Sequence, residues 1–250
     1  MRSILPPPGR VRFEPDTVVA IVVAALSSLC LLAGCVTAAM QETARTAPPG
    51  GFEGGASLNP VYIPFDSAAG KPQVTPAYEC YGKVGLSDNS DLGCRLGNGS
   101  VGLSGKYRLL SGGVEVAARL GASAGFTLAG SLLGNLRPVI GWWTASSSVI
   151  ASHEPTSGLP WAFSAGLDYS VLTYEIGEAP VGADWLDLKA GAGIPFRVGR
   201  SLRLMPEAGI VLPQAGSLRR SSDTDFLPGV RPMLTLGITL AAVNQNYSMH

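Results

Sequence analysis

The stretch Trp185–Val198, WLDLKAGAGIPFRV, alternates between two unlike faces from end to end. Every even-numbered position is apolar: Leu186, Leu188, Ala190, Ala192, Ile194, Phe196 and Val198. The odd-numbered positions are mostly small or charged, apart from Trp185 at the start. A period of two is typical of a β-strand whose two faces meet different environments. We therefore predict a strand over 185–198, longer than the usual five to six or so residues.

The same pattern recurs on both sides of this stretch. It continues in 201–212, after a tight hairpin at Gly199-Arg200, and it returns in 161–171 and 229–241. Weaker strand patterns make up the rest: 77–86, 91–97, 100–110, 113–121, 124–132 and 137–149. Asn98-Gly99 is a strong hairpin signal between two of these, whereas 114–132 also allows a short helix. The sequence thus predicts an all-β chain, an antiparallel up-and-down β-barrel of about 8–10 strands.

The composition excludes several classes of protein. Charged residues make up 14% of the 250 residues, and the mean hydropathy is +0.25, whereas disordered chains are polar and highly charged. The 18 basic and 18 acidic residues cancel, so the chain lacks the basic patch that nucleic acid requires. We therefore expect a folded domain with no nucleic-acid partner.

Two kinds of barrel fit the alternation, and they differ in the face that points outward. A soluble, lipocalin-like barrel buries the apolar face, whereas a membrane barrel turns it to lipid. The strands are long enough to cross a bilayer, which takes about 9–11 residues, and the polar face is rich in Gly and Ser. Aromatic residues gather towards the strand ends, as in an interfacial belt: Tyr78, Trp142, Trp143, Trp161, Tyr174 and Trp185. The pattern across 77–243 resembles that of small outer-membrane β-barrel proteins, and a tethered soluble binder is the alternative.

A second resemblance lies at the N-terminus. The uncharged run Thr17–Leu32 has the length of a signal-peptide core, and it ends in Leu32-Ala33-Gly34-Cys35. This tetrapeptide resembles the lipobox of bacterial lipoproteins. The resemblance implies a signal peptide over 1–34, cleavage before Cys35, and acylation (palmitate) of that cysteine. Since Val36 rather than Asp follows, it also implies transfer to the outer membrane of a Gram-negative cell envelope.

The region after the lipobox divides into two parts. Residues 35–73 are rich in Ala, Pro and Gly, which predicts a flexible, lipid-anchored tether, and residues 74–250 form the barrel domain. Cys80 and Cys94 then lie in an oxidising compartment, on the apolar face of neighbouring strands. We predict a disulfide between them; two thiols are the alternative.

Charged residues on the polar face are expected to meet inside the barrel. The alternation of odd and even positions along each strand places nine basic and five acidic residues on this face: Glu79, Lys83, Arg95, Lys106, Arg108, Glu115, Arg119, Asp168, Asp187, Lys189, Arg197, Arg203, Glu207 and Arg231. Buried charges must be partnered, so we interpret the set as an ion-pair network that fills the lumen. Its excess of about four positive charges leaves a narrow, anion-preferring pore as the alternative.

The sequence contains little that indicates catalysis. His153-Glu154, with a serine from 146–148, offers an acid/base pair for a membrane-embedded lipid hydrolase, the least favoured alternative. We expect no enzyme, no cofactor and no metal site. The expected function is that of a structural or interaction protein whose partners are outer-membrane lipid and, through Arg219-Arg220, lipopolysaccharide or another envelope protein.

Overall fold

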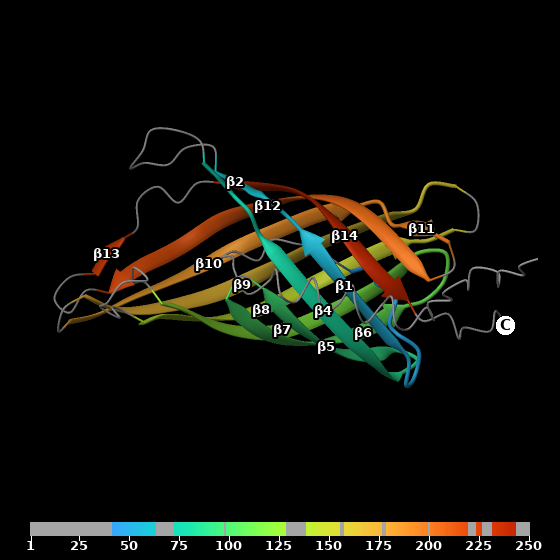
Figure 1. The fold of residues 1–250 in the computed structure, drawn as a ribbon, viewed down its shortest axis with the longest axis horizontal. Coiled ribbons are helices and arrows are strands. Elements are labelled where there is room, and N and C mark those ends of the chain that lie inside the picture. Colours follow the sequence, from blue (N-terminus) through green and yellow to red (C-terminus); the bar gives the residue numbers. More distant parts are fainter. Residues whose placement is uncertain are drawn as a thin grey trace, which may run out of the picture.

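The computed structural model describes residues 42–63, 73–97, 99–128, 139–155, 158–176, 179–199, 201–219, 224–226 and 232–243. In this part of the chain, ten antiparallel strands pair in sequence order into a closed barrel (Figure 1). They are β1 (Phe52–Leu58), β4 (Tyr78–Ser87), β5 (Ser90–Gly97), β6 (Ser100–Leu110), β7 (Glu115–Leu128), β8 (Val139–His153), β9 (Trp161–Ile176), β10 (Ala179–Gly193), β12 (Leu202–Arg219) and β14 (Met233–Val243). The all-β barrel expected from the alternation is confirmed.

The barrel closes where its first and last strands meet. β14 pairs with β12 on one side and with β1 on the other, from Glu53 beside Val243 to Leu58 beside Ile238. Figure 1 shows this seam as blue β1 lying next to red β14. Four short strands extend the sheet outside the ring: β2 (Val61–Ile63), β3 (Gln73–Thr75), β11 (Phe196–Val198) and β13 (Thr224–Phe226).

Two of the sequence-based predictions change in detail. The stretches 113–121 and 124–132 belong largely to one continuous strand, β7, so the helix allowed over 114–132 does not form. β1 lies within 35–73, the region assigned to the tether. Its sequence, FEGGASL, has small residues on both faces, which hides the alternation. Small residues are required there, because a Cβ on Gly55 would lie 2.5 Å from the backbone oxygen of Leu240 across the seam.

The apolar face of the strands points outward. Leu103, Leu120 and Leu236 are 60%, 68% and 69% exposed, whereas Lys83, Lys106 and Arg203 are 5% exposed or less. A soluble protein has the opposite arrangement, with charged residues outside and leucines inside. The soluble, lipocalin-like alternative is therefore wrong, since it requires the leucine face to be the core.

The two ends of the barrel differ. At one end, called here the terminal end, β1 begins and β14 ends, and the connections are 88–89, 111–114, 154–160 and 194–201. At the other, called here the loop end, the connections are 59–77, 98–99, 129–138, 177–178 and 220–232. Among the described residues, there is no helix with the length and apolar character that crossing a membrane demands.

Candidate functional site

The chain just before β1 lies inside the barrel. We call residues 42–49 the lumen strap. Glu42, Thr43, Ala44, Thr46 and Ala47 are between 0% and 4% exposed, although they belong to no strand. The predicted tether included these residues, and the flexibility expected of them is wrong, because they are buried among the inward side chains of the barrel.

Lys106, from the middle of β6, holds the strap. Its Nζ lies 3.2 Å from Glu42 Oε2, and it donates to the carbonyl oxygens of Thr43 (3.2 Å) and Arg45 (2.8 Å). The same ammonium lies 3.3 Å from Asp91 Oδ2 on β5. Arg119 on β7 binds the other oxygen of Glu42 at 3.3 Å. A buried ammonium is thus surrounded by two carboxylates and two carbonyls, which satisfies its charge and all three of its donors.

Other barrel side chains bind the backbone and hydroxyls of the strap. The amide of Ala44 donates to Ser152 Oγ at 3.0 Å, and the amide of Ala47 donates to Asp91 Oδ2 at 3.2 Å. Thr46 Oγ1 donates to the carbonyl of Asp88 in the β4–β5 turn at 2.8 Å. The strap is therefore attached to β5, β6, β7 and β8, and it fills the lumen towards the terminal end.

The charge of Glu42 follows from these neighbours. Burial by itself would raise the pKa of this carboxyl, but Lys106, together with Lys83 and Arg119, lowers the pKa well below its usual range. Glu42 is thus ionised at neutral pH, and the strap is held by charge as well as by hydrogen bonds.

A second ion cluster lies beside the strap. Glu53, on β1, forms ion pairs with Arg203 and with Lys83, whose Nζ lies 3.3 Å away, and it accepts a hydrogen bond from Tyr81 Oη at 3.3 Å. Arg203 also reaches Thr43 Oγ1 of the strap at 3.5 Å. This cluster ties the seam strand β1 to its neighbour β4 and, across β14, to β12 through buried charges.

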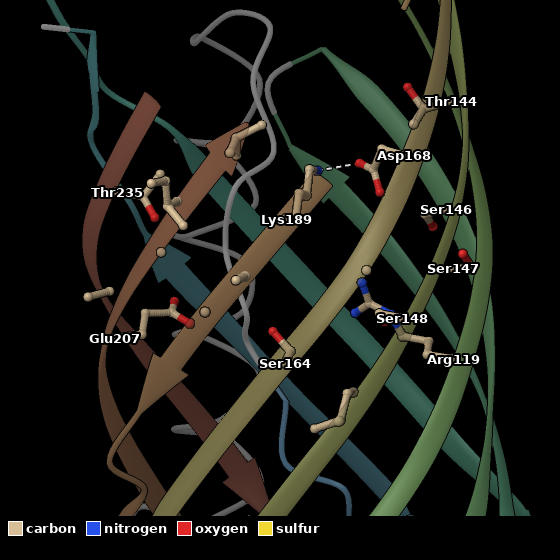
Figure 2. Close-up of a pocket in the computed structure, with 18 of the residues that line it drawn as sticks. Arg119, Thr144, Ser146, Ser147, Ser148, Ser164, Asp168, Lys189, Glu207 and Thr235 are labelled. Atoms are coloured by element: carbon tan, nitrogen blue, oxygen red, sulfur yellow. Dashed lines mark ion pairs between the residues drawn. The ribbon is translucent and has the colours of Figure 1, made fainter. Parts of the chain in front are cut away.

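Beyond the strap, the lumen contains a polar cavity of about 60 Å³, which is large enough for a few water molecules. Figure 2 shows its lining: Arg119 and the serines of β8 on one side, and Glu207 with Thr235 on the other. Lys189 and Asp168 form an ion pair at its edge, and Thr144 and Ser170 share a hydrogen bond of 2.9 Å. Arg119 belongs to both sites, since it lines the cavity and binds Glu42.

Most of the residues predicted to face the lumen do lie there. They are Glu79, Lys83, Arg95, Lys106, Glu115, Arg119, Asp168, Asp187, Lys189, Arg203 and Glu207.

Three members of the predicted set differ. Arg108 lies at the terminal end, where a register shift near its strand end lets its guanidinium bind the carbonyl of Asp88 at 2.7 Å. Arg197 is on β11, which pairs only with β12 and lies beyond the end of β10, so its side chain is 59% exposed. The prediction that Arg197 lies in the lumen is wrong, whereas Arg108 keeps the parity of Lys106 and lies at the rim of the barrel. Arg231 lies outside the described residues.

Three carboxylates of the lumen were missed. Glu42 and Glu53 were assigned to the tether, and Asp91 was left out of the set although it begins the predicted strand 91–97 and shares the parity of Arg95. In the described part of the lumen, eight carboxylates (Glu42, Glu53, Glu79, Asp91, Glu115, Asp168, Asp187, Glu207) face six cations (Lys83, Arg95, Lys106, Arg119, Lys189, Arg203). The expected excess of positive charge is therefore wrong for these residues.

The predicted disulfide does not form between the described cysteines. Cys80 pairs with Leu96 in the strand register, and Cys94 pairs with Gly82, so the two cysteines are diagonal neighbours on the outer face. Diagonal side chains lie about 7–8 Å apart, whereas the Cβ atoms of a disulfide lie about 3.5–4.5 Å apart. The two cysteines share one face of the sheet, as predicted. The pairing of β4 with β5 is displaced by two residues from the pairing that would place them opposite each other.

The residues proposed for a hydrolase are not brought together. Ser146 and Ser148 line the cavity, whereas the His153 ring contacts the carbonyl of Gly113 at the terminal end. Ser148 and His153 are separated by about 16 Å along one strand, and their parity differs. No group of three or more His, Cys, Asp or Glu among the described residues could hold a metal ion. Cys35 and Arg220 lie outside the described residues.

Comparisons with known proteins add little. No family model matches the chain, and no curated protein matches it. Solved structures with a similar chain path include neisserial surface protein A (9% identity over 78% of this chain and 96% of that one, TM-score 0.37). The translocator domain of the autotransporter NalP from Neisseria meningitidis is 10% identical (92% and 95% covered, TM-score 0.41), and Omp33 of Acinetobacter baumannii is 10% identical (80% and 100%, TM-score 0.33).

Proposed function

We propose that this chain is a lipid-anchored β-barrel of the Gram-negative outer membrane, with a structural or interaction role and no catalytic activity. The observation that carries the proposal is the outward leucine face around a charged interior, which suits a barrel surrounded by lipid. The lipobox resemblance of Leu32-Ala33-Gly34-Cys35 supports an acyl anchor on Cys35. Outer-membrane lipid is then its first partner.

The contents of the lumen support a closed barrel rather than a pore. The strap and its ion pairs occupy the lumen towards the terminal end, and the described lumen holds eight carboxylates against six cations. An anion-preferring pore needs an open path and an excess of positive charge along it. In planar bilayers we expect the purified protein to give no single-channel conductance.

The anchor is tested with a single substitution. Cells that express the wild type should incorporate radiolabelled palmitate into the protein, and the Cys35→Ser variant should lose the label and retain its signal peptide. Cys30→Ser is the matched control, because Cys30 lies in the same apolar run but outside the tetrapeptide. Label that persists in Cys35→Ser contradicts the anchor.

Insertion of the barrel is tested on residues 36–250 exported behind a cleavable signal peptide, which removes both the acyl chains and the apolar run Thr17–Leu32. A protein held only by its acyl chains leaves the membrane in sodium carbonate when these are absent, whereas an inserted barrel stays. We expect this protein to remain in the carbonate-washed membrane fraction. Its release would contradict the membrane barrel, whatever the result of the labelling experiment.

A further inference from the structure

We propose that the barrel contains a peptide-binding site, and that the lumen strap is its ligand, held in cis. The ligand class is a short peptide that carries one carboxylate followed by small side chains, as in Glu42-Thr43-Ala44. This inference deepens the closed lumen of the proposed function and rests on it.

The backbone pairing that closes the barrel does not involve the strap. The ring of ten strands closes without it, since β14 pairs directly with β1. Within the described chain, residues 42–48 belong to no strand, and the single bridge is at Pro49 beside Gly85. The barrel's backbone hydrogen bonds therefore remain when the strap leaves.

The strap is recognised in the way in which a peptide ligand is recognised. Side chains of the barrel bind its backbone: Lys106 binds two carbonyls, Ser152 binds the amide of Ala44, and Asp91 binds the amide of Ala47. These contacts fix the backbone of the strap without depending on its side chains, as in other modes of peptide recognition.

Two features give the site its selectivity. Lys106 and Arg119 bind the two oxygens of Glu42, so a carboxylate is required at this position. Ala44 packs in a fully buried cluster with Ala117 and Ile150, which leaves space for a small side chain only. The site thus accepts an acidic residue and, two residues later, an alanine.

Loss of the strap would change the lumen. Lys106, Asp91 and Arg119 would face water, and the space would join the cavity through Arg119, which lines both. The strap is then the part that separates this cavity from the terminal end of the barrel.

The first test measures whether the strap can leave the folded barrel. A cysteine is placed in the full-length chain by Thr43→Cys, after all four native cysteines (Cys30, Cys35, Cys80 and Cys94) have been replaced by alanine, and its modification by a polar maleimide is timed in detergent. With Glu42 intact we expect slow modification, because Thr43 is fully buried. Glu42→Lys sets like charge against Lys106 and Arg119, so we expect modification at least ten times faster with an unchanged β-sheet circular dichroism spectrum.

Asp88→Lys is the matched control for this substitution. It makes the same change of charge in an exposed turn, and Asp88 contacts the strap through its backbone carbonyl only. We expect it to leave the rate of maleimide modification at position 43 within a factor of two. Where Glu42→Lys fails to fold, the milder Glu42→Gln replaces it. If neither variant folds, the strap is an integral part of the barrel and the proposal is overturned.

The second test supplies the ligand in trans. A fluorescent peptide of residues 40–49, MQETARTAPP, is titrated against each folded protein, and binding is followed by fluorescence anisotropy. We expect it to bind the Glu42→Lys protein and not the wild type, whose site is occupied. Adding Lys106→Met to Glu42→Lys should weaken peptide binding at least tenfold.

Equal binding by all of these proteins, or binding by none, would overturn the peptide site. Neither experiment depends on the acyl anchor or on the cellular membrane. A failure here is therefore distinguishable from a failure of the proposed function, which the palmitate and carbonate experiments decide separately.

Discussion

The ammonium of Lys106 lies 3.2 Å from the carboxylate of Glu42, although 64 residues separate them in the sequence. One partner belongs to the middle of a strand and the other to a segment without regular structure. Both side chains are almost completely buried. This contact joins the segment before the barrel to the barrel wall.

Removal of Lys106 should destabilise the protein strongly. Lys106→Met removes the cation shared by Glu42 and Asp91 and leaves two buried carboxylates without it. Loss of one partner of a buried ion pair costs about 3–5 kcal/mol. We expect the free energy of unfolding in urea, measured by circular dichroism in detergent, to fall by about this amount. Arg197→Met removes a mostly exposed cation and should cost under about 1 kcal/mol.

The pH should control the strap in one direction. The pKa of Glu42 is lowered in the folded protein, so its contribution is fully present above the pKa of an unfolded glutamate, about 4.3, and is lost as the pH falls further. The amide of Ala44, which donates to Ser152, reports docking. We expect its hydrogen-exchange protection factor, corrected for intrinsic rate, to be constant from about pH 8 to pH 5.

The charged groups that act on Glu42 are Lys106, Lys83, Arg119 and Arg95. Basic side chains in general are protonated in acid, so a fall in pH acts on the strap through carboxylates. Below about pH 4 the protection of Ala44 should decline in the wild type and be flat in Glu42→Gln. The same acid-induced decline in both proteins would show that another group controls the strap.

The lipid-facing surface is tested at one central position. Leu120 lies in the middle of β7 and is 68% exposed. An arginine on the lipid face costs about 2–4 kcal/mol at the bilayer midplane and much less near the interface. We expect Leu120→Arg to reduce folding into vesicles, as followed by tryptophan fluorescence. Ser111→Arg, in the exposed β6–β7 turn, should fold as the wild type does.

The orientation of β12 offers an independent check. Arg203 faces the lumen and is 5% exposed, whereas the neighbouring Leu204 has the parity of the outer face. A spin label at position 204 in bilayers should be reached by a lipid-soluble quencher, and a label at 203 should not. Quenching of position 203 by the lipid-soluble reagent would reverse the assignment of the two faces.

The two cysteines should both be found as thiols. Their diagonal register places Cys80 and Cys94 too far apart for a disulfide. Alkylation under denaturing, non-reducing conditions should therefore modify both residues, as counted by mass spectrometry. Modification of neither would mean that the register of β4 and β5 is displaced by two residues from the one described.

The strands with large apolar residues could be predicted from the sequence, and the rest could not. Leu186, Leu188 and Ile194 alternate with charged or small residues, so their strand and its outer face follow from the period. β1 lacks this signal, because Gly54, Gly55 and Ala56 offer no contrast between faces. Its place depends on partners that lie far away in the sequence.

The strap was missed for a related reason. Its small residues and prolines also suit a flexible linker, and local composition does not distinguish a linker from a segment that is held inside a barrel. Glu42 was the available signal, because it is an acidic residue that precedes a predicted barrel with a surplus of cations. The surplus itself was the sign that carboxylates were missing from the predicted lumen.

The closure of the barrel should depend on Gly55. A Cβ at this position would lie 2.5 Å from the backbone oxygen of Leu240 and 3.0 Å from Cα of Ala241, and backbone on the neighbouring strand cannot move aside as a flexible side chain can. Gly55→Ala should therefore separate β1 from β14 locally. We expect the free energy of unfolding to fall by about 1–3 kcal/mol, within the range of overpacking substitutions.

Gly105→Ala is the matched control, since a Cβ there meets nothing within 4 Å and faces outward. It should change the stability by less than about 0.5 kcal/mol. Equal effects of the two substitutions in the same urea titration would argue against the β1–β14 seam.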